Sequence, residues 1–169
     1  MTASTATTLR WVVMGVSGCG KSFIGSLLAS QLKVDYVEGD ELHPPENVAK
    51  MSAGVPLTDA DRAGWLATLR ERIALARGQG VGLVVSCSAL KRAYRDLLRQ
   101  GDPGLRFAHL DGPREVLLQR MQDRQHFMPA SLLDSQLQTL QPLQADEAGI
   151  VLDFRQPPEM LVEQLLQAA

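Results

Sequence analysis

The first chemistry that the sequence offers is a glycine-rich segment that ends in a lysine and a serine. The segment fits the pattern G-x-x-x-x-G-K-[S/T] at every fixed position, and its members are Gly15, Val16, Ser17, Gly18, Cys19, Gly20, Lys21 and Ser22. Glycines let the chain wrap so that backbone N–H groups face phosphate oxygens. Lys21 is then expected to reach the β- and γ-phosphates, and the Ser22 hydroxyl to bind the Mg²⁺ that bridges them. The pattern predicts a loop that binds ATP and Mg²⁺; the alternative is a glycine-rich turn without a ligand.

Two acidic residues follow the second apolar run of the chain, at positions 38 and 40. Phosphoryl transfer to an alcohol needs a carboxylate that takes the hydroxyl proton. Asp40 is the candidate, at the end of a strand that we expect beside the strand of the loop; its alternative role is a helix N-cap. Glu38, on the same face of an extended chain, is expected to hold a water of the magnesium shell or simply to end an exposed strand.

Strands and helices alternate around these residues. Apolar runs predict five short strands, at 11–14, 34–37, 82–86, 106–110 and 150–154. Apolar residues at helical spacing predict helices at 21–31, 59–77, 91–100, 114–124 and 159–168. Parallel neighbours need crossover connections, which helices make best. The sequence therefore predicts an α/β fold with a parallel five-stranded sheet covered by helices on both faces.

Two stretches that contain prolines, 43–58 and 125–144, fit this alternation poorly, and the second holds a short helix-like run between Pro129 and Pro142. In alternating α/β folds, such excursions at the carboxyl ends of strands form substrate loops and lids. The predicted organisation is a single domain over 1–169, with a disordered tail at 1–8, a substrate-binding region at about 43–80 and a lid region at about 120–144.

Composition and charge exclude several classes of protein. The 169 residues carry 17 basic and 19 acidic side chains, which gives no electrostatic footprint for binding nucleic acid or membranes. No apolar run approaches the ~18 residues needed to span a bilayer, and no signal peptide is apparent. Two cysteines, Cys19 and Cys87, are too few for a disulfide scaffold or a zinc cage. We expect a cytoplasmic protein that binds neither nucleic acid nor a membrane.

Three further groups of residues accompany the glycine-rich loop. They are Glu38-Gly-Asp-Glu-Leu-His-Pro44 with Pro56-Leu-Thr-Asp-Ala-Asp-Arg62 and Trp65; Ser86-Cys-Ser-Ala-Leu-Lys-Arg92; and Arg120-x-x-x-Arg124-x-His126-Phe-Met-Pro129 with Ser135 and Gln136. Together these groups resemble the gluconokinase family, a relative of shikimate kinase and adenylate kinase, over residues 10–142. Two positions depart from the family pattern, because Gly64 replaces an expected proline and Gln141 an expected glutamate. Neither position touches the expected chemistry.

The resemblance implies a three-layer P-loop kinase fold with a mobile lid. It also implies transfer of a phosphoryl group from ATP to D-gluconate with Mg²⁺, and a homodimer. Other acceptors stay open at this point, namely shikimate, a nucleoside monophosphate or another sugar acid. A non-catalytic module in which ATP only switches conformation is a further alternative.

A sugar acid is an anion with many hydroxyls, so its site needs a positive charge and several polar groups. The candidates for the positive charge are Arg62, Lys91 and Arg92, and each could instead be a solvated charge on a helix. Ser86 and Ser88 are expected to face the γ-phosphate and the acceptor. The family pattern adds substrate-binding roles for Asp40, His43, Ser88 and His126, although His43 could instead only order its loop.

Arg120 and Arg124 are one helical turn apart and so share a face of their helix. The resemblance implies that one stacks on adenine and that the other meets phosphates when a lid closes, which makes Arg124 a candidate catalytic residue. The alternative is a pair of exposed arginines. Pro157 is expected to form the other wall of the adenine site, or only to start the last helix.

Overall fold

The computed structural model describes residues 9–123 and 131–168. Within them, five parallel strands form one sheet in the order β2-β3-β1-β4-β5. The strands are β1 (Arg10–Met14), β2 (Asp35–Glu38), β3 (Leu83–Ser86), β4 (Arg106–Asp111) and β5 (Gly149–Asp153). The prediction of a parallel five-stranded sheet is confirmed.

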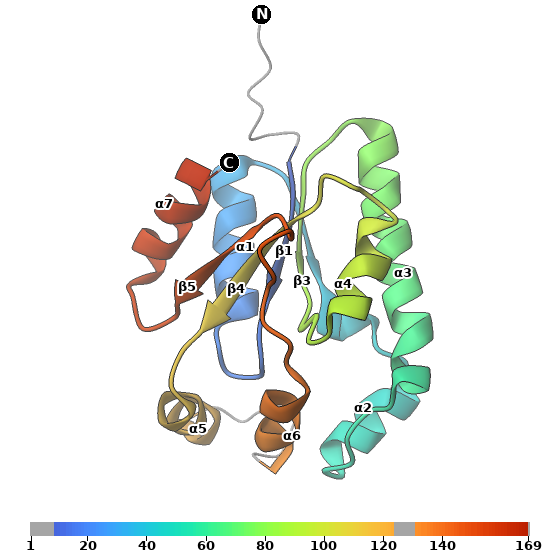
Figure 1. Ribbon diagram of the computed structural model, residues 1–169, viewed down its shortest axis with the longest axis vertical. Coiled ribbons are helices and arrows are strands. Elements are labelled where there is room, and N and C mark those ends of the chain that lie inside the picture. Colours follow the sequence, from blue (N-terminus) through green and yellow to red (C-terminus); the bar gives the residue numbers. More distant parts are fainter. Residues whose placement is uncertain (1–8, 124–130, 169) are drawn as a thin grey trace, which may run out of the picture.

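Helices cover both faces of the sheet. Those of the described residues are α1 (Lys21–Leu32), α2 (Pro45–Ser52), α3 (Asp59–Gln79), α4 (Arg92–Arg99), α5 (Arg114–Asp123), α6 (Ser131–Thr139) and α7 (Pro158–Ala168), with a 3₁₀ turn, η2 (Gly39–Leu42). Helices α1 and α7 lie on one face, and α3 and α4 on the other (Figure 1). The remaining helices, α2, α5 and α6, gather where the strands end, at the bottom of Figure 1.

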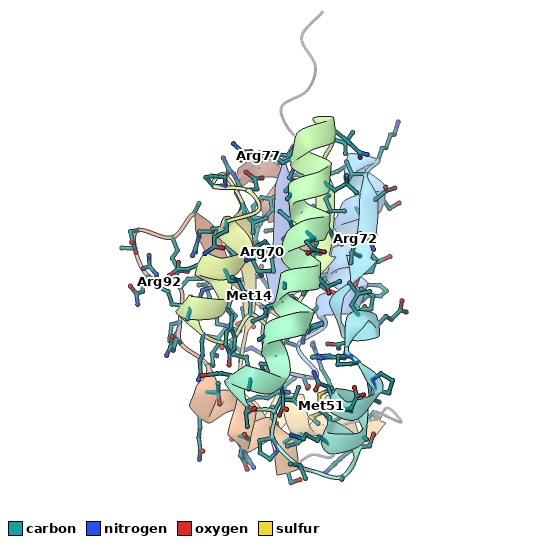
Figure 2. The ribbon with its side chains drawn as sticks, turned by 90° about the vertical axis from the view of Figure 1, so that its right-hand side faces the viewer. Met14, Met51, Arg70, Arg72, Arg77 and Arg92 are labelled. Carbon is teal, nitrogen blue, oxygen red and sulfur yellow. The ribbon has the colours of Figure 1, made fainter. Side chains whose placement is uncertain are left out.

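An apolar layer fills each side of the sheet because successive strand residues point to opposite faces. In β1, Trp11 and Val13 join the cluster under α1 and α7, whereas Val12 and Met14 join the cluster under α3 and α4. Figure 2 views the second face, where α3 lies in front of Met14. The four residues predicted for the inner face of α3 are all buried: Leu66, Leu69, Ile73 and Ala76.

Several predicted boundaries were wrong by one or two residues. The strand predicted from residue 34 begins at Asp35, because Lys33 ends α1 in the left-handed conformation with φ 58° and Val34 N–H donates to Ala29 O at 3.0 Å. The last strand begins at Gly149 and ends at Asp153, so Phe154 lies in the turn that follows. Strand prediction uses the pattern of apolar residues, and this pattern does not show such local hydrogen bonds. The exact first and last residues of a strand are therefore not predicted by it.

Helix α2 was not predicted, since prolines at its start indicated an irregular excursion. Pro45 occupies the first helical position, where a missing N–H costs nothing and the fixed φ favours a helix. Lys50 of α2 pairs with Asp61 of α3 at 2.9 Å, and the Asn47 side chain donates to Asp61 O at 2.9 Å. These contacts join α2 to the start of α3.

The position of β2 corrects a second expectation. Strand β3 pairs with both β1 and β2, so β2 does not lie beside the strand of the glycine-rich loop.

Two free cysteines are described, Cys19 and Cys87, and both are buried. No helix among the described residues is both long and apolar enough to cross a membrane.

Candidate active site

Three adjoining cavities lie where the strands end, and neighbouring cavities share lining residues. The residues common to the first and second cavities are Ser17, Lys21 and Asp40. Those common to the second and third cavities are Gly20, Phe23 and Arg120. The cavities therefore adjoin one another in a row, with the glycine-rich loop in the middle, and we call this row the channel.

The glycine-rich loop connects β1 to α1 and lines the second cavity. Gly20 is the N-cap of α1, with φ 96° and no side-chain cap, so the first N–H groups of the helix can receive an anion. Gly15 and Gly18 also have positive φ, 142° and 86°. Val16 and Cys19 of the same loop are buried, and burial raises the pKa of the Cys19 thiol. Only glycine adopts such a loop without strain.

Lys21 and Ser17 place two nitrogen donors at the border of the first and second cavities. Lys21 Nζ donates to Val16 O at 3.1 Å, within its own loop. The Ser17 N–H donates to Gln136 Oε1 of α6 at 2.8 Å. The loop thus contacts α6 across the channel.

A cluster of hydroxyl groups surrounds Glu38 at the end of β2. The Tyr36 hydroxyl lies 2.8 Å from Glu38 Oε2 and 2.7 Å from Ser86 Oγ, and Ser86 Oγ–H donates to Glu38 Oε1 at 2.8 Å. Burial raises the pKa of Glu38, but hydrogen bonds from Ser22, Tyr36 and Ser86 outweigh it and leave this pKa below its ordinary value. An ionised carboxylate beside the Ser22 hydroxyl is a set of hard oxygen donors, which suits Mg²⁺.

Asp40 reaches the channel because the chain turns sharply after β2. A methyl group at Gly39 would lie 2.1 Å from Ser86 O, so only glycine fits against β3. The Trp65 indole N–H donates to Gly39 O at 2.7 Å and holds the turn. Since Asp40 lies in η2, it does not share an extended strand with Glu38 as predicted, because the extended conformation ends at Glu38.

The alternative role of Asp40 as an N-cap is also contradicted. The N-cap of η2 is Glu38, and the N-cap of α2 is Pro44. Asp40 instead lines the first and second cavities together with Lys21. A carboxylate and an ammonium group therefore share the border where an acceptor would meet a phosphate.

His43 lines the first cavity and stacks on Trp65 with ring centroids 4.0 Å apart. Burial lowers the pKa of His43, so the ring is neutral at pH 7. The Asn47 amide nitrogen lies 3.3 Å from His43 Nδ1. Because an amide NH₂ group only donates, Nδ1 is the acceptor and Nε2 carries the proton. His43 can therefore donate one hydrogen bond to an oxygen in the cavity.

Of the three candidate cations for a carboxylate, only Arg62 lines the first cavity. Its Nη1 donates to the Tyr94 hydroxyl at 2.8 Å, which holds the guanidinium from one side. Ser88 lines the same cavity, and its carbonyl accepts the Gly15 N–H at 3.3 Å. The loop after β3 is thereby attached to the glycine-rich loop.

Lys91 and Arg92 are engaged elsewhere and do not line the described cavities. Lys91 Nζ pairs with Asp59 at 2.9 Å. Arg92 forms a bidentate ion pair with Asp146, in which Nη1 and Nη2 lie 2.6 and 2.8 Å from the two carboxylate oxygens. Figure 2 shows Arg92 at the edge of the molecule, apart from Met51, which lines the first cavity.

Arg120 borders the second and third cavities and is held by the protein backbone. Its guanidinium donates to Gly18 O and Cys19 O at 3.3 Å and to Phe154 O at 3.0 Å, and it lies 4.6 Å from the Phe154 ring centroid. The third cavity is otherwise mostly apolar, lined by Phe23, Ile24 and Leu161 among others. Pro157 is not among its lining residues, which include Gln156 and Pro158 on either side.

Two predicted residues, Arg124 and His126, lie outside the described residues, as do the N-terminal tail and part of the expected lid. Other lining residues received no role from the sequence, among them Phe23, Gln136 and Phe154. Phe23 left a signal in the sequence, because a large apolar side chain directly follows the phosphate motif; the structure leaves this side chain 59% exposed. Gln136 was noted only as a member of a residue group that carries the family resemblance. Phe154 left no signal, since it reaches the site through the packing of a distant element.

Comparison with known proteins supports a sugar-acid kinase. A family model described as shikimate kinase matches residues 17–169. A gluconokinase of Gluconobacter oxydans is 48% identical over 92% of this chain and 88% of its own length. The thermosensitive gluconokinase of Escherichia coli is 46% identical over 94% of this chain and 86% of its own length.

Solved structures give the same result. A gluconokinase from Sinorhizobium meliloti superposes with a TM-score of 0.86 at 48% identity, covering 96% of this chain and 91% of that chain. A shikimate kinase from Aquifex aeolicus, with a TM-score of 0.59 at 16% identity over 95% of each chain, shares the fold alone.

Proposed function

Because this chain belongs to the gluconokinases, within the shikimate kinase family of ATP-dependent kinases, we propose that it phosphorylates D-gluconate to 6-phospho-D-gluconate. The observation that carries the proposal is the row of three adjoining cavities, which share lining residues. The third cavity would take the adenine, the second the phosphates and the first the sugar acid. Asp40 and Lys21, shared by the first two, lie where the acceptor hydroxyl would meet the γ-phosphoryl group.

In this reaction, Asp40 accepts the proton of the attacking hydroxyl while the oxygen forms its bond to phosphorus and the bond to the ADP oxygen breaks. The N–H groups at the start of α1 and the Lys21 ammonium stabilise the negative charge on the phosphoryl oxygens. Lys21 now contacts only a carbonyl of its own loop among the described hydrogen bonds, so it can turn to a phosphate without breaking an ion pair. Arg120 lies between the second and third cavities, where the phosphates join the nucleoside.

We place the magnesium ion at Ser22 and Glu38, the hydroxyl and the ionised carboxylate that share a hydrogen bond. When bound, Mg²⁺ neutralises charge on the phosphates. Tyr36 and Ser86 orient the Glu38 carboxylate, which leaves it able to accept a hydrogen bond from a water of the metal.

Arg62 is our candidate for the substrate carboxylate, since it is the lining guanidinium of the first cavity. His43 Nε2–H and Ser88 then serve the sugar hydroxyls. The neutral His43 ring, stacked on Trp65, adds no charge that would compete with Arg62.

A panel of acceptors tests the proposal directly. ADP release by the purified protein is measured with ATP and Mg²⁺ in the presence of D-gluconate, shikimate or a nucleoside monophosphate. We expect ADP release to depend on gluconate, and the Lys21→Ala variant to lose it. ADP release without acceptor dependence would favour a nucleotide switch and contradict the assignment. A homodimer is a further proposal that rests on the family resemblance, and chromatography with light scattering tests it. A cytoplasmic location is a proposal that rests on the cysteine content and the apolar pattern of the sequence.

A further inference from the structure

Tyr94 lies behind the wall of the first cavity, in α4. This helix and α3 cover the same face of the sheet (Figure 1). The Tyr94 ring belongs to the apolar cluster under the two helices, and only 6% of the residue is exposed. Because the core holds the ring, the hydroxyl at its tip has a defined position.

Two residues in the first turns of α3 meet at this hydroxyl. Asp59 and Arg62 are three positions apart and so share a face of the helix. Arg62 Nη1 donates to the Tyr94 hydroxyl at 2.8 Å, and this hydroxyl donates to Asp59 Oδ1. The same carboxylate oxygen accepts a hydrogen bond from Lys91 Nζ at 2.9 Å. Tyr94 is therefore the middle of a chain of hydrogen bonds that runs from the cavity to the surface.

The chemistry of the groups fixes the direction of this chain. A guanidinium only donates hydrogen bonds, so the Tyr94 oxygen accepts from Arg62 and its proton points to Asp59. Burial raises the pKa of Tyr94, whereas hydrogen bonds from Tyr94 and Lys91 lower the pKa of Asp59. At pH 7 the hydroxyl keeps its proton and the carboxylate is ionised, and these are the states that the chain needs.

The contact with Tyr94 restricts the orientation of the Arg62 guanidinium. Besides the hydrogen bond of Nη1, Arg62 Cζ lies 5.4 Å from the centroid of the Tyr94 ring. A guanidinium is planar, so two fixed points on it limit the directions of its other N–H groups. A carboxylate that binds two parallel N–H groups needs the plane in one orientation. Tyr94 thus prepares the side chain that we assign to the substrate carboxylate.

We propose that Tyr94 is a positioning residue for the acceptor: its hydroxyl holds the Arg62 guanidinium in the orientation that receives the carboxylate of the sugar acid. This inference rests on the proposed function and on the role of Arg62 within it. Tyr94 is not among the described residues that line the first cavity, so it acts through Arg62. A guanidinium that is already oriented loses less freedom when the acceptor binds, and this raises the affinity.

Tyr94→Phe keeps the ring and removes the hydroxyl. We expect it to raise the KM for gluconate roughly threefold to tenfold, the effect of one lost hydrogen bond. The kcat and the Kd of an ATP analogue, measured by calorimetry, should stay within about twofold, because the proton acceptor and the phosphate loop are unchanged.

Thr68→Val is the matched control, since it removes another hydroxyl from a hydrogen bond on α3. Thr68 Oγ1 donates to Gly64 O at 3.0 Å, and Thr68 is exposed and does not line the described cavities. This variant should match the wild type in both KM and kcat. Thermal unfolding of each variant shows that it is folded at the assay temperature.

A double substitution shows whether Tyr94 acts through Arg62. In the Arg62→Ala background, Tyr94→Phe should change kcat/KM for gluconate by less than about twofold, because no guanidinium is left to orient. A merely structural role of the hydroxyl would lower kcat/KM in both backgrounds. Asp59→Ala is a second variant at an exposed position. It removes the acceptor of the Tyr94 proton and should also raise the KM for gluconate.

An unchanged KM in Tyr94→Phe would overturn the inference, and so would a loss of equal size in the Arg62→Ala background. If Tyr94→Phe were unfolded at the assay temperature, Asp59→Ala would decide, and a wild-type KM in that variant would overturn the inference. A wild-type KM in Arg62→Ala would do the same, because Tyr94 would then orient a group without a role. Failure of the proposed function is distinct from these outcomes, since the wild-type protein would then show no gluconate-dependent ADP release.

Discussion

Asp40 owes its place in the channel to two features of its surroundings. Gly39 allows η2 to pass against β3, and the Trp65 indole holds the Gly39 carbonyl at 2.7 Å. The carboxylate therefore lies on a short, braced turn rather than on a free loop. A group that must meet a hydroxyl at hydrogen-bond distance gains from such bracing.

Replacement of Asp40 by asparagine removes the proton acceptor while keeping its size. We expect Asp40→Asn to lower kcat by roughly 10²- to 10⁴-fold, with the Kd of an ATP analogue within about threefold. Coupled ADP detection and calorimetry measure the two quantities. Glu41→Gln in the same turn is the control, because Glu41 is exposed and does not line the described cavities. Wild-type turnover by Asp40→Asn would show that another group takes the proton.

The three candidate cations make a second comparison at the residue scale. Arg62→Ala should raise the KM for gluconate by roughly 10- to 100-fold, since a hydrogen bond to a charged group is lost. Lys91→Ala should leave this KM within about twofold, because Lys91 pairs with Asp59 outside the cavity. Steady-state kinetics with varied gluconate measures both. Equal effects of the two substitutions would remove the basis for choosing Arg62.

At the scale of elements, a buried ion pair joins α4 to the segment between α6 and β5. Arg95 Nε and Nη2 contact the Glu147 carboxylate at 2.7 and 3.0 Å, and both side chains are fully buried. Arg95 also donates to Ala89 O at 2.9 Å and to Pro142 O at 3.3 Å. Ala89, with φ 45°, directly follows Ser88 of the first cavity. The pair therefore holds a strained loop beside the site.

This pair predicts a pH dependence of stability. Burial raises the pKa of Glu147, but Arg95 and Arg99 outweigh burial and lower it from 4.5 to about 2. A carboxyl whose folded pKa is lowered stabilises the protein above its unfolded pKa and loses that effect as the pH falls toward the folded value. We expect Glu147 to contribute fully above about pH 5 and progressively less down to about pH 2.

Glu147→Gln tests this by urea unfolding at several pH values. The variant should lose about 3 kcal/mol of unfolding free energy at pH 7, because Arg95 is left buried without its partner charge. The difference from the wild type should shrink as the pH falls from 5 toward 2. Asp153→Asn is the control, since Asp153 pairs with Arg155 in solvent, a local contact that an unfolded chain can also make. If the difference in unfolding free energy stayed constant with pH, ionisation of Glu147 would not be the cause of the pH dependence.

At the scale of the whole molecule, the channel is built from segments far apart in the sequence. The first cavity draws on the glycine-rich loop, η2, α2, α3, the loop after β3 and α6, which meet where the strands end (Figure 1). An unfolded chain cannot bring these segments together. Ligands of the channel should therefore bind only the folded state and stabilise it.

Thermal unfolding measures this stabilisation. An ATP analogue with Mg²⁺ at about 100 times its Kd should add about 2.7 kcal/mol to the unfolding free energy. For a domain of this size, that corresponds to a rise in Tm of roughly 5 to 10 °C. Lys21→Ala at the same concentrations should show a much smaller rise. No rise in the wild-type protein would contradict nucleotide binding at the glycine-rich loop.

Much of the fold and part of the site were predictable because they depend on local patterns. Apolar runs and helical spacing gave the five strands and five of the helices, and the phosphate motif gave the loop with Lys21 and Ser22. Helix α2 was not predicted because it begins with prolines, which usually break helices. At the N-terminal end of a helix, however, proline is compatible with the helical conformation.

The amino-acid sequence by itself determined the sheet, the phosphate loop and the resemblance to gluconokinases, since each is written in residues close together in the chain. Tertiary structure decided that β3 lies between β1 and β2, that Arg62 rather than Lys91 or Arg92 lines the first cavity, and that Gln136 reaches Ser17. The physical reason is that strand order and side-chain contacts across the channel depend on the packing of distant elements, which no local pattern records.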